Sequence, residues 1–190
     1  METYRRRASV LEAEREYRAQ AEHLVVREPG KAERRLAWAE VRTVRLGFAP
    51  TEQKLGRFVT ALDFASGERL ELDNMHWRGF GDFEDRSPDY RLFVEAAAER
   101  IAAQAPEAAA YAGASRVDYF GQIALLAGPF ALLGWALSLV GPLERVGHVV
   151  TAIGLLGALP VALAWMVLSR PRPLDLSALP TAVLPPRPEA

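Results

Sequence analysis

The chain has 190 residues, a formal net charge of -1 at pH 7 and no cysteine. The absence of cysteine excludes disulfides, thiolate catalysis and cysteine-ligated metals, and the near-zero charge gives no reason to expect nucleic acid as a partner. Arginine outnumbers lysine 21 to 2, a coding bias that indicates a GC-rich bacterial genome.

The first 22 residues are predicted to contain an N-terminal helix. Ser9 and Glu12 have the spacing of a capping box, and apolar side chains from Val10 to Leu24 recur at helical intervals. An arginine triplet precedes this segment at Arg5, Arg6 and Arg7. We expect the triplet either to be a solvated helix start, which is favoured, or to contact anionic headgroups.

From His23 onward the pattern alternates with a period of two, which predicts short antiparallel strands. The clearest feature is a hairpin in which residues 58–64 and 69–73 flank the turn Ser66-Gly67. Weaker strand patterns occupy residues 24–27, 34–38 and 43–48. The sequence therefore predicts an α+β domain over residues 23–105, with a small antiparallel sheet that has one covered face.

A helix is predicted to cover that sheet. Ser87 is a good N-cap and Pro88 a good first helical residue. The apolar face of the helix is expected to consist of Tyr90, Phe93, Val94, Ala97 and Ile101. Pro106 ends or kinks the helix, and residues 106–118 are expected to be a linker.

Two long segments, residues 119–141 and 146–169, contain no Asp, Glu, Lys or Arg and have the length of transmembrane helices. Because only four residues join them, they are predicted to form a membrane hairpin, and the basic residues outside the turn place both termini in the cytoplasm. Together with the coding bias, this predicts a multi-pass protein of the bacterial inner (cytoplasmic) membrane.

Small residues recur at four-residue spacing within these two segments, which predicts close helix packing. They are Ala124, Gly128, Gly134, Ser138, Gly147, Thr151, Gly154 and Ala158. The last 21 residues, 170–190, contain six prolines and are predicted to be an extended, disordered tail.

The order of elements over residues 23–105, with the step Arg35-Leu36-Ala37-Trp38-Ala39-Glu40-Val41, resembles the bacterial pleckstrin-homology-like (PH-like) domains, which are often attached to transmembrane helices. The resemblance is topological. It implies a partly open barrel of two sheets, capped by the last helix, and a non-enzymatic role in binding or oligomerisation. That fold usually has seven strands and the sequence predicts five or six, so a plain α+β sheet covered by a helix is the alternative.

Eukaryotic relatives of that fold bind inositol phospholipids through basic residues around the first hairpin. The resemblance therefore draws attention to Arg27, Lys31, Arg34 and Arg35. Residues 24–62 carry eight basic and four acidic residues, whereas residues 63–112 carry five and eleven. Headgroup contact by this group is one hypothesis, and ordinary surface charge is the alternative.

The loop expected at residues 74–86 offers two further candidates. Carboxylates and one histidine gather in and next to it, at Asp73, His76, Asp82, Glu84 and Asp85. They are a conceivable oxygen-rich cation site, but their spacing is unspecific and a solvated acidic loop is favoured. Trp77, Phe80 and Phe83 either form a partner-contact patch or plug the open end of the sheet.

No catalytic or cofactor motif stands out, so we expect neither an enzyme nor a cofactor, and no small-molecule substrate is identified. The favoured hypothesis is a membrane-anchored, non-catalytic scaffold or accessory subunit of an inner-membrane assembly, acting by association with itself or with another membrane protein. One alternative is a peripheral sensor of anionic lipid headgroups at the bilayer. The least favoured is an enzyme that uses the acidic loop.

Overall fold

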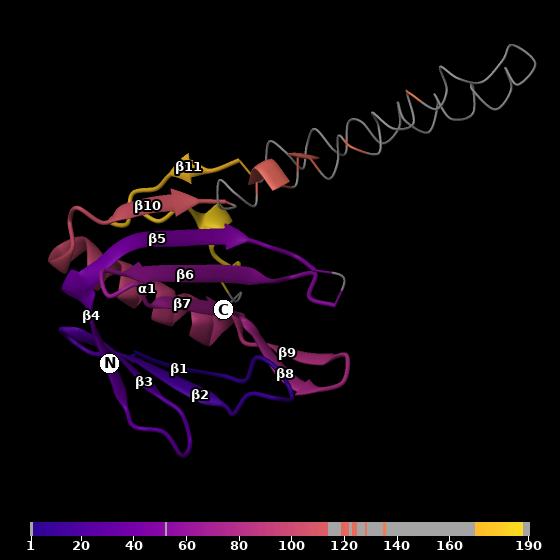
Figure 1. Cartoon of the computed structure of the whole chain (residues 1–190), viewed down its shortest axis with the longest axis horizontal. Coiled ribbons are helices and arrows are strands. Elements are labelled where there is room, and N and C mark those ends of the chain that lie inside the picture. The colour runs from indigo at the N-terminus through magenta and orange to yellow at the C-terminus, as the bar shows by residue number, and fades with distance from the viewer. Residues whose placement is uncertain are drawn as a thin grey trace, which may run out of the picture. The chain divides into compact units, whose positions relative to one another are not determined.

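The computed structural model describes residues 2–51, 53–113, 119–121, 123, 124, 128, 135 and 170–187. The chain divides into two compact units, one made of residues 1–113 and 172–190 and the other of residues 114–171. The described part of the first unit is mostly β-structure, with three sheets and one α-helix, α1 (Ser87–Gln104) (Figure 1).

The first sheet is an antiparallel meander in the order β1-β2-β3-β4. Its strands are β1 (Glu2–Arg6), β2 (Arg15–Ala19), β3 (His23–Arg27) and β4 (Arg34–Ala37). Tyr4 on β1 and Tyr17 on β2 lie opposite each other in register and are both buried. Their neighbours along each strand point away from the core, as expected for a sheet with one covered face.

The second sheet has the order β11-β10-β5-β6-β7. Its strands are β5 (Val41–Phe48), β6 (Phe58–Phe64), β7 (Arg69–Asp73), β10 (Ala109–Ala112) and β11 (Arg172–Pro173). The predicted hairpin is present as β6 and β7, which pair antiparallel, and Gly67 takes the positive φ of +84° that favours glycine in the turn. β10 runs parallel to β5 and pairs with β11, so residues 112 and 172 are held opposite each other at one sheet edge.

The two sheets are joined through a buried tryptophan. A short 3-10 turn, η1 (Trp38–Glu40), leads from β4 into β5. Trp38 is fully buried, and its indole N–H donates to the carbonyl oxygen of Gln20 at 2.9 Å. This hydrogen bond satisfies the one polar atom of the side chain, so the ring contributes to the core without an unpaired donor.

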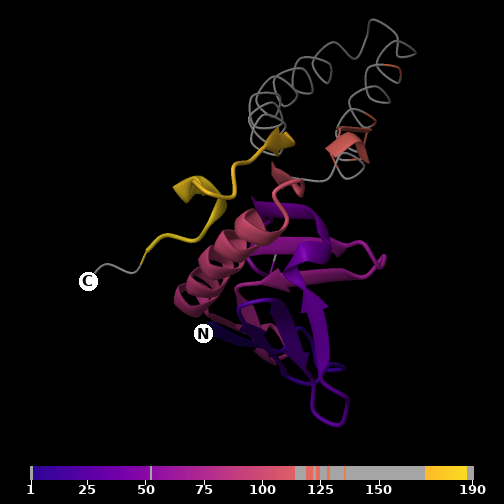
Figure 2. The same ribbon diagram turned by 90° about the vertical axis from the view of Figure 1, so that its left-hand side faces the viewer.

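The third sheet is the two-stranded hairpin of β8 (Met75–Gly79) and β9 (Asp82–Asp85), which precedes α1. Figure 2 shows α1 lying beside the two larger sheets. All five residues of its predicted apolar face, Tyr90, Phe93, Val94, Ala97 and Ile101, are buried. The rings of Tyr4, Tyr17, Tyr90 and Phe93 approach one another with centroid separations of 5.7 to 6.4 Å.

The predicted N-terminal helix is wrong, because residues 2–6 and 15–19 form β1 and β2. Ser9 and Glu12, which have the spacing of a capping box, instead close a turn in which the Glu12 N–H donates to the Ser9 carbonyl oxygen at 3.3 Å. The true period in these strands is two: Tyr4 and Arg6 are buried on β1. Because one of the buried residues is an arginine, the sequence of β1 does not show alternating apolar and polar residues.

The predicted fold class, in which a two-helix membrane hairpin follows the domain, is also corrected. Within the residues that the structure describes, no helix is long and apolar enough to cross a membrane, and β-sheet dominates. The multi-pass inner-membrane location inferred from that hairpin therefore does not stand. Of residues 119–141 and 146–169, only 119–121, 123, 124, 128 and 135 are described, and they are helical; the remainder of that prediction lies outside the described residues.

Three segments expected to lack regular structure contain strands. The loop expected at residues 74–86 contains β8 and β9. β10 lies within the expected linker, residues 106–118, and the C-terminal segment contains β11 and a second 3-10 turn, η3 (Thr181–Val183). Val183 and Leu184 join the core of the first unit, with exposed fractions of 9% and 2%. A proline-rich composition does not prevent such packing, because proline is compatible with extended chain at a sheet edge.

Candidate functional site

A buried ion cluster joins β1 to the end of β7. The Asp73 side chain is fully buried, and its Oδ2 accepts hydrogen bonds from Arg6 Nη2 at 2.9 Å and from Arg57 Nε at 2.7 Å. Arg6 Nη1 also donates to the Glu71 carbonyl oxygen at 3.2 Å, and the Tyr4 hydroxyl donates to the Asp73 carbonyl oxygen at 2.6 Å. Side chains of β1 thus donate hydrogen bonds to the last residues of β7, just before the chain enters β8.

Asn74 connects that point to the start of α1. Its buried Oδ1 accepts from the Phe58 N–H at 2.7 Å, and its Nδ2 lies 3.0 Å from the Gly56 carbonyl oxygen. The same Nδ2 lies 2.9 Å from Asp85 Oδ1 and 2.8 Å from Ser87 Oγ. Asp85 Oδ1 accepts from the Ser87 N–H at 2.9 Å. The prediction that Ser87 is the N-cap is wrong, because α1 begins at Ser87 and its N-cap is Arg86, which makes no side-chain capping hydrogen bond.

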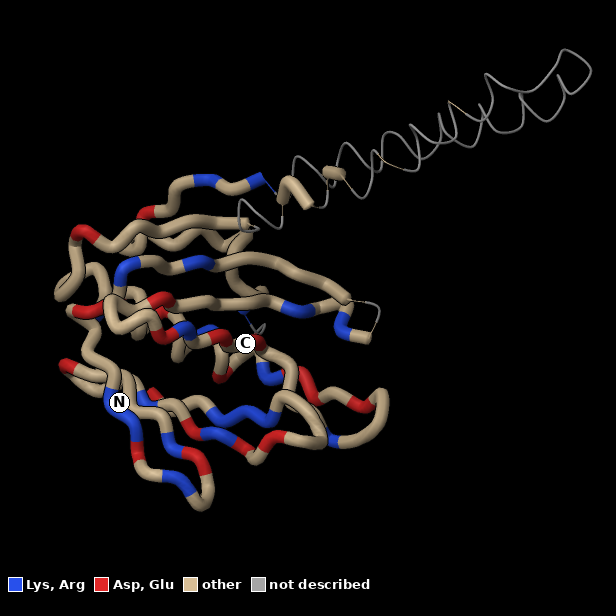
Figure 3. The backbone as a smooth tube through the Cα atoms, viewed as in Figure 1, with Lys and Arg blue, Asp and Glu red and all other residues tan. Residues whose placement is uncertain are grey.

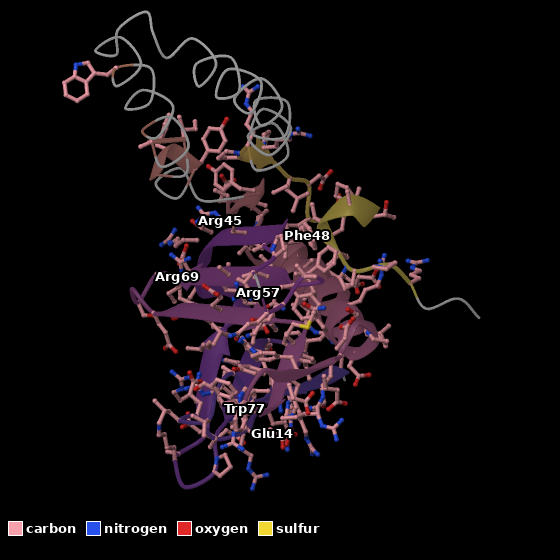
Figure 4. The ribbon with its side chains drawn as sticks, turned by 90° about the vertical axis from the view of Figure 1, so that its right-hand side faces the viewer. Glu14, Arg45, Phe48, Arg57, Arg69 and Trp77 are labelled. Atoms are coloured by element: carbon pink, nitrogen blue, oxygen red, sulfur yellow. The ribbon has the colours of Figure 1, made fainter. Side chains whose placement is uncertain are left out.

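Three neighbouring loops form what we call the hairpin end: the β1–β2 loop (residues 7–14), the β5–β6 loop (49–57) and the β8–β9 turn (79–82). The Arg7 guanidinium lies 4.5 Å from the centroid of the Trp77 ring, and the Trp77 N–H donates to the Arg7 carbonyl oxygen at 2.8 Å. Lys54 Nζ lies 4.4 Å from the centroid of Phe83, the residue opposite Trp77 in the hairpin register. Both other loops therefore contact the β8–β9 hairpin, and Figure 4 looks onto this end with Trp77 labelled.

Large apolar side chains project from the tips of the hairpin end. Leu11, Leu55 and Phe80 have exposed fractions of 93%, 75% and 104%. Of the aromatic trio predicted as a partner contact, Phe80 is fully exposed, whereas Trp77 and Phe83 are half-buried under the two cations. Phe80 is therefore available for contact with a partner, whereas Trp77 and Phe83 mainly contact neighbouring loops of the same chain.

A charged cleft of about 560 Å³ lies between the β1–β2 loop, the β3–β4 turn and the β6–β7 turn. Its charged lining consists of Arg6, Arg15, Lys31, Arg34 and Arg69 with Glu12, Glu28, Glu68 and Glu71. Glu28 accepts from Lys31 at 2.7 Å and from Arg15 at 3.1 Å, and these hydrogen bonds hold the pKa of the Glu28 carboxyl below its usual value, Lys31 having the larger effect. Arg6 Nε is buried in this cleft region and has no hydrogen-bond partner among the described residues.

The seven basic residues predicted to contact headgroups do not form one patch. Arg6, Lys31 and Arg34 line the charged cleft. The other four lie apart from it: Arg5 pairs with Glu16 at 3.2 Å, Arg35 pairs with Glu33 at 3.1 Å, Arg7 donates to backbone carbonyls of its own loop, and Arg27 is exposed on β3. Figure 3 shows basic and acidic positions interspersed along the first sheet, so this sheet has mixed charge.

The predicted acidic cation site is not assembled. No group of three or more His, Asp or Glu residues in the described part of the chain is close enough to hold a metal ion. Glu84 accepts from Arg86 at 3.2 Å, and Asp73 and Asp85 have the structural roles given above. Burial, and then the nearby charge of Arg86, lowers the pKa of His76, whose Nδ1 accepts from the Arg7 N–H at 3.1 Å.

Only two of the residues predicted to pack membrane helices are described. Ala124 and Gly128 are helical, and Ala124 is exposed within the described structure. Gly134, Ser138, Gly147, Thr151, Gly154 and Ala158 lie outside the described residues.

Comparisons with protein-family models, with curated proteins and with solved structures gave no significant match for this chain.

Two residues of the hairpin end, Leu11 and Leu55, were not predicted. Leu11 was assigned to a helix that does not exist. Leu55 lies beside Gly56 in a segment with turn-forming residues, and a large apolar residue in a turn is a signal that sequence reasoning could have used.

Proposed function

We propose that the chain is a non-catalytic association module with a PH-like domain, and that the hairpin end is the surface that binds another protein chain. A four-stranded meander, a three-stranded meander and a closing helix follow one another along the chain. This order supports the PH-like assignment, with β8, β9, β10 and β11 as additions. The first partner to test is a second copy of the chain.

The observation that carries the proposal is the exposure of Leu11, Leu55 and Phe80 on the three loops that the Arg7–Trp77 and Lys54–Phe83 contacts connect. Exposed large apolar side chains on a folded domain are typical of contact surfaces, since their burial against a partner removes apolar area from water. Trp77 and Phe83 are held by cations beneath the tips, so less conformational freedom is lost on binding.

Charged pairs join the base of the β8–β9 hairpin to the β1–β2 loop. Arg86, whose N–H donates to the Asn74 carbonyl oxygen, pairs with Glu14 at 3.3 Å and with Glu84 at 3.2 Å. These pairs help to hold the two loops in their relative positions.

The test is sedimentation velocity of the full chain over a range of concentrations. We expect self-association, and we expect the triple variant Leu11→Ser, Leu55→Ser, Phe80→Ser to weaken it at least about ten-fold, because interface anchors of this kind each contribute about 1 kcal/mol or more. Leu92→Ser is the matched control, since Leu92 is 60% exposed but lies on α1. A chain that stays monomeric, or a control that is equally weakened, would contradict the proposal.

A second candidate function is binding of an anionic headgroup in the charged cleft. It is favoured by Arg6 Nε, a buried donor that lacks a partner among the described residues, because such donors are costly to leave unpaired. The four glutamates of the cleft oppose it. If the cleft has this role, the full chain will sediment with anionic but not with neutral vesicles at low salt, and Arg34→Gln with Arg69→Gln will reduce that binding.

A further inference from the structure

The C-terminal residues 179–187 fill a groove on the first unit. Val183 and Leu184 are the inserted side chains, with exposed fractions of 9% and 2%, and both belong to the same apolar cluster as residues of α1 and β5. η3 contacts β5 directly. The groove therefore runs between α1 and the second sheet, and its apolar floor is covered by two consecutive aliphatic side chains.

Polar contacts fix the direction of the segment. Arg91 on α1 is buried, donates from Nη1 to the Pro185 carbonyl oxygen, and donates from Nε to Glu95 Oε1 at 2.9 Å. Glu95 also pairs with Arg187 at 3.7 Å. Because the Arg91 guanidinium is buried, its N–H donors need acceptors within the protein. Arg91 therefore favours a segment that presents a backbone carbonyl at this position.

Proline restricts the backbone on both sides of the 3-10 turn η3 that the groove accepts. Pro180 precedes the turn and Pro185 and Pro186 follow the inserted pair, and proline fixes φ at about -65°. Because the segment is already restricted before it docks, less conformational entropy is lost on docking.

Removal of the segment breaks no pairing within β1 to β10. Its contacts are three buried residues, Val183, Leu184 and Pro185, the hydrogen bond to Arg91 and a partly exposed ion pair. A segment held by so few contacts opens more readily than the core of a domain. The empty groove would then present an apolar floor and the donors of Arg91.

We infer that this groove is a binding site for a proline-flanked 3-10 turn that presents two adjacent aliphatic residues, and that the tail of a second copy is the partner that replaces the chain's own. Exchange of an identical segment between copies creates no new type of contact. The chain's own tail has the advantage of a high effective concentration, so exchange increases when that tail is released. This association does not involve the hairpin end.

Thiol crosslinking in the full chain tests the inference, because the chain has no cysteine of its own. A donor copy carries Arg187→Cys, and an acceptor copy carries Glu95→Cys, the two positions whose long side chains meet at their tips in the structure. A bifunctional maleimide then replaces the length of the two side chains, which a direct disulfide is too short to span. The acceptor also carries Val183→Asp and Leu184→Asp, which release its own tail. The matched control acceptor carries Thr181→Asp and Ala182→Asp instead, which add the same charge at exposed positions.

With the bifunctional maleimide we expect a crosslinked heterodimer, with a yield at least about ten-fold higher for the released acceptor than for the control acceptor. A single chain with both Glu95→Cys and Arg187→Cys should be crosslinked within itself. If that internal crosslink forms but mixed copies give no heterodimer, or if both acceptors give equal yields, exchange is wrong. If neither crosslink forms, the groove assignment itself is wrong, and the hairpin-end association is unaffected by either result.

Discussion

Replacement of Asp73 by Asn removes the negative charge from the buried ion cluster. In the natural chain Asp73 Oδ2 accepts from Arg6 at 2.9 Å and from Arg57 at 2.7 Å. The side chain of Arg6 is only 9% exposed, so it cannot turn to water as readily as Arg57, which is 19% exposed. Leaving one partner of a buried ion pair uncompensated costs about 3–5 kcal/mol.

Urea denaturation of the full chain, followed by tryptophan fluorescence, measures this cost. We expect Asp73→Asn to lower the free energy of unfolding by about 3–5 kcal/mol, and Arg6→Met in the same chain to recover part of the loss because it removes the orphaned charge. Glu68→Gln is the control: it breaks the pair with Arg34, whose side chains are 49% and 30% exposed, and should cost about 0–1 kcal/mol. If Asp73→Asn costs no more than Glu68→Gln, the buried cluster does not have the structural role assigned to it.

Three further predictions concern stability. Phe93→Ala should lower the free energy of unfolding by about 3–5 kcal/mol, whereas Leu92→Ala should change it by less than about 0.5 kcal/mol, because Phe93 is 1% and Leu92 60% exposed; chemical denaturation compares the two. His76 has a folded-state pKa below its ordinary value, so the unfolded chain takes up the proton at a higher pH than the folded chain does. The free energy of unfolding should therefore fall as pH drops below about 6.5. Its loss between about pH 7.5 and 5.5 should be smaller in His76→Gln, as chemical denaturation at the two pH values measures. Asn74→Ala leaves the buried Phe58 N–H without its acceptor and should cost about 1–3 kcal/mol, with a matching fall in the thermal midpoint.

The sequence predicted those elements whose cause is local. The hairpin of β6 and β7 follows from alternation around Ser66-Gly67, and α1 follows from apolar spacing after Pro88. In both cases neighbouring residues in the sequence determine the structure, so the pattern is visible without knowledge of the fold.

The remaining elements depend on partners far away in the sequence. β1 was missed because Arg6 is buried, and its burial is possible only with Asp73, 67 residues later. The tail was predicted to be disordered because it is rich in proline, whereas the burial of Leu184 depends on its contacts with the rest of the core, which includes α1 and β5. β10 has an alanine-rich sequence without alternation, and its strand conformation follows from pairing with β5.

The candidate site was predicted in part for the same reason. Phe80 was recognised as a possible contact, because an aromatic residue in a loop is a local signal. The positions of Leu11 and Leu55 beside it depend on how Arg7 and Lys54 hold their loops against Trp77 and Phe83, which no local pattern shows.

Hydrogen exchange of the full chain at low and high concentration tests the central claim most directly, because it reports protection loop by loop. If the hairpin end is an association surface, amide protection will rise with concentration in the β1–β2 loop, the β5–β6 loop and the β8–β9 turn, and will not rise on the exposed side of α1 around Leu92. Protection in these three loops that is the same at every concentration, in a sample shown to associate, would contradict the account.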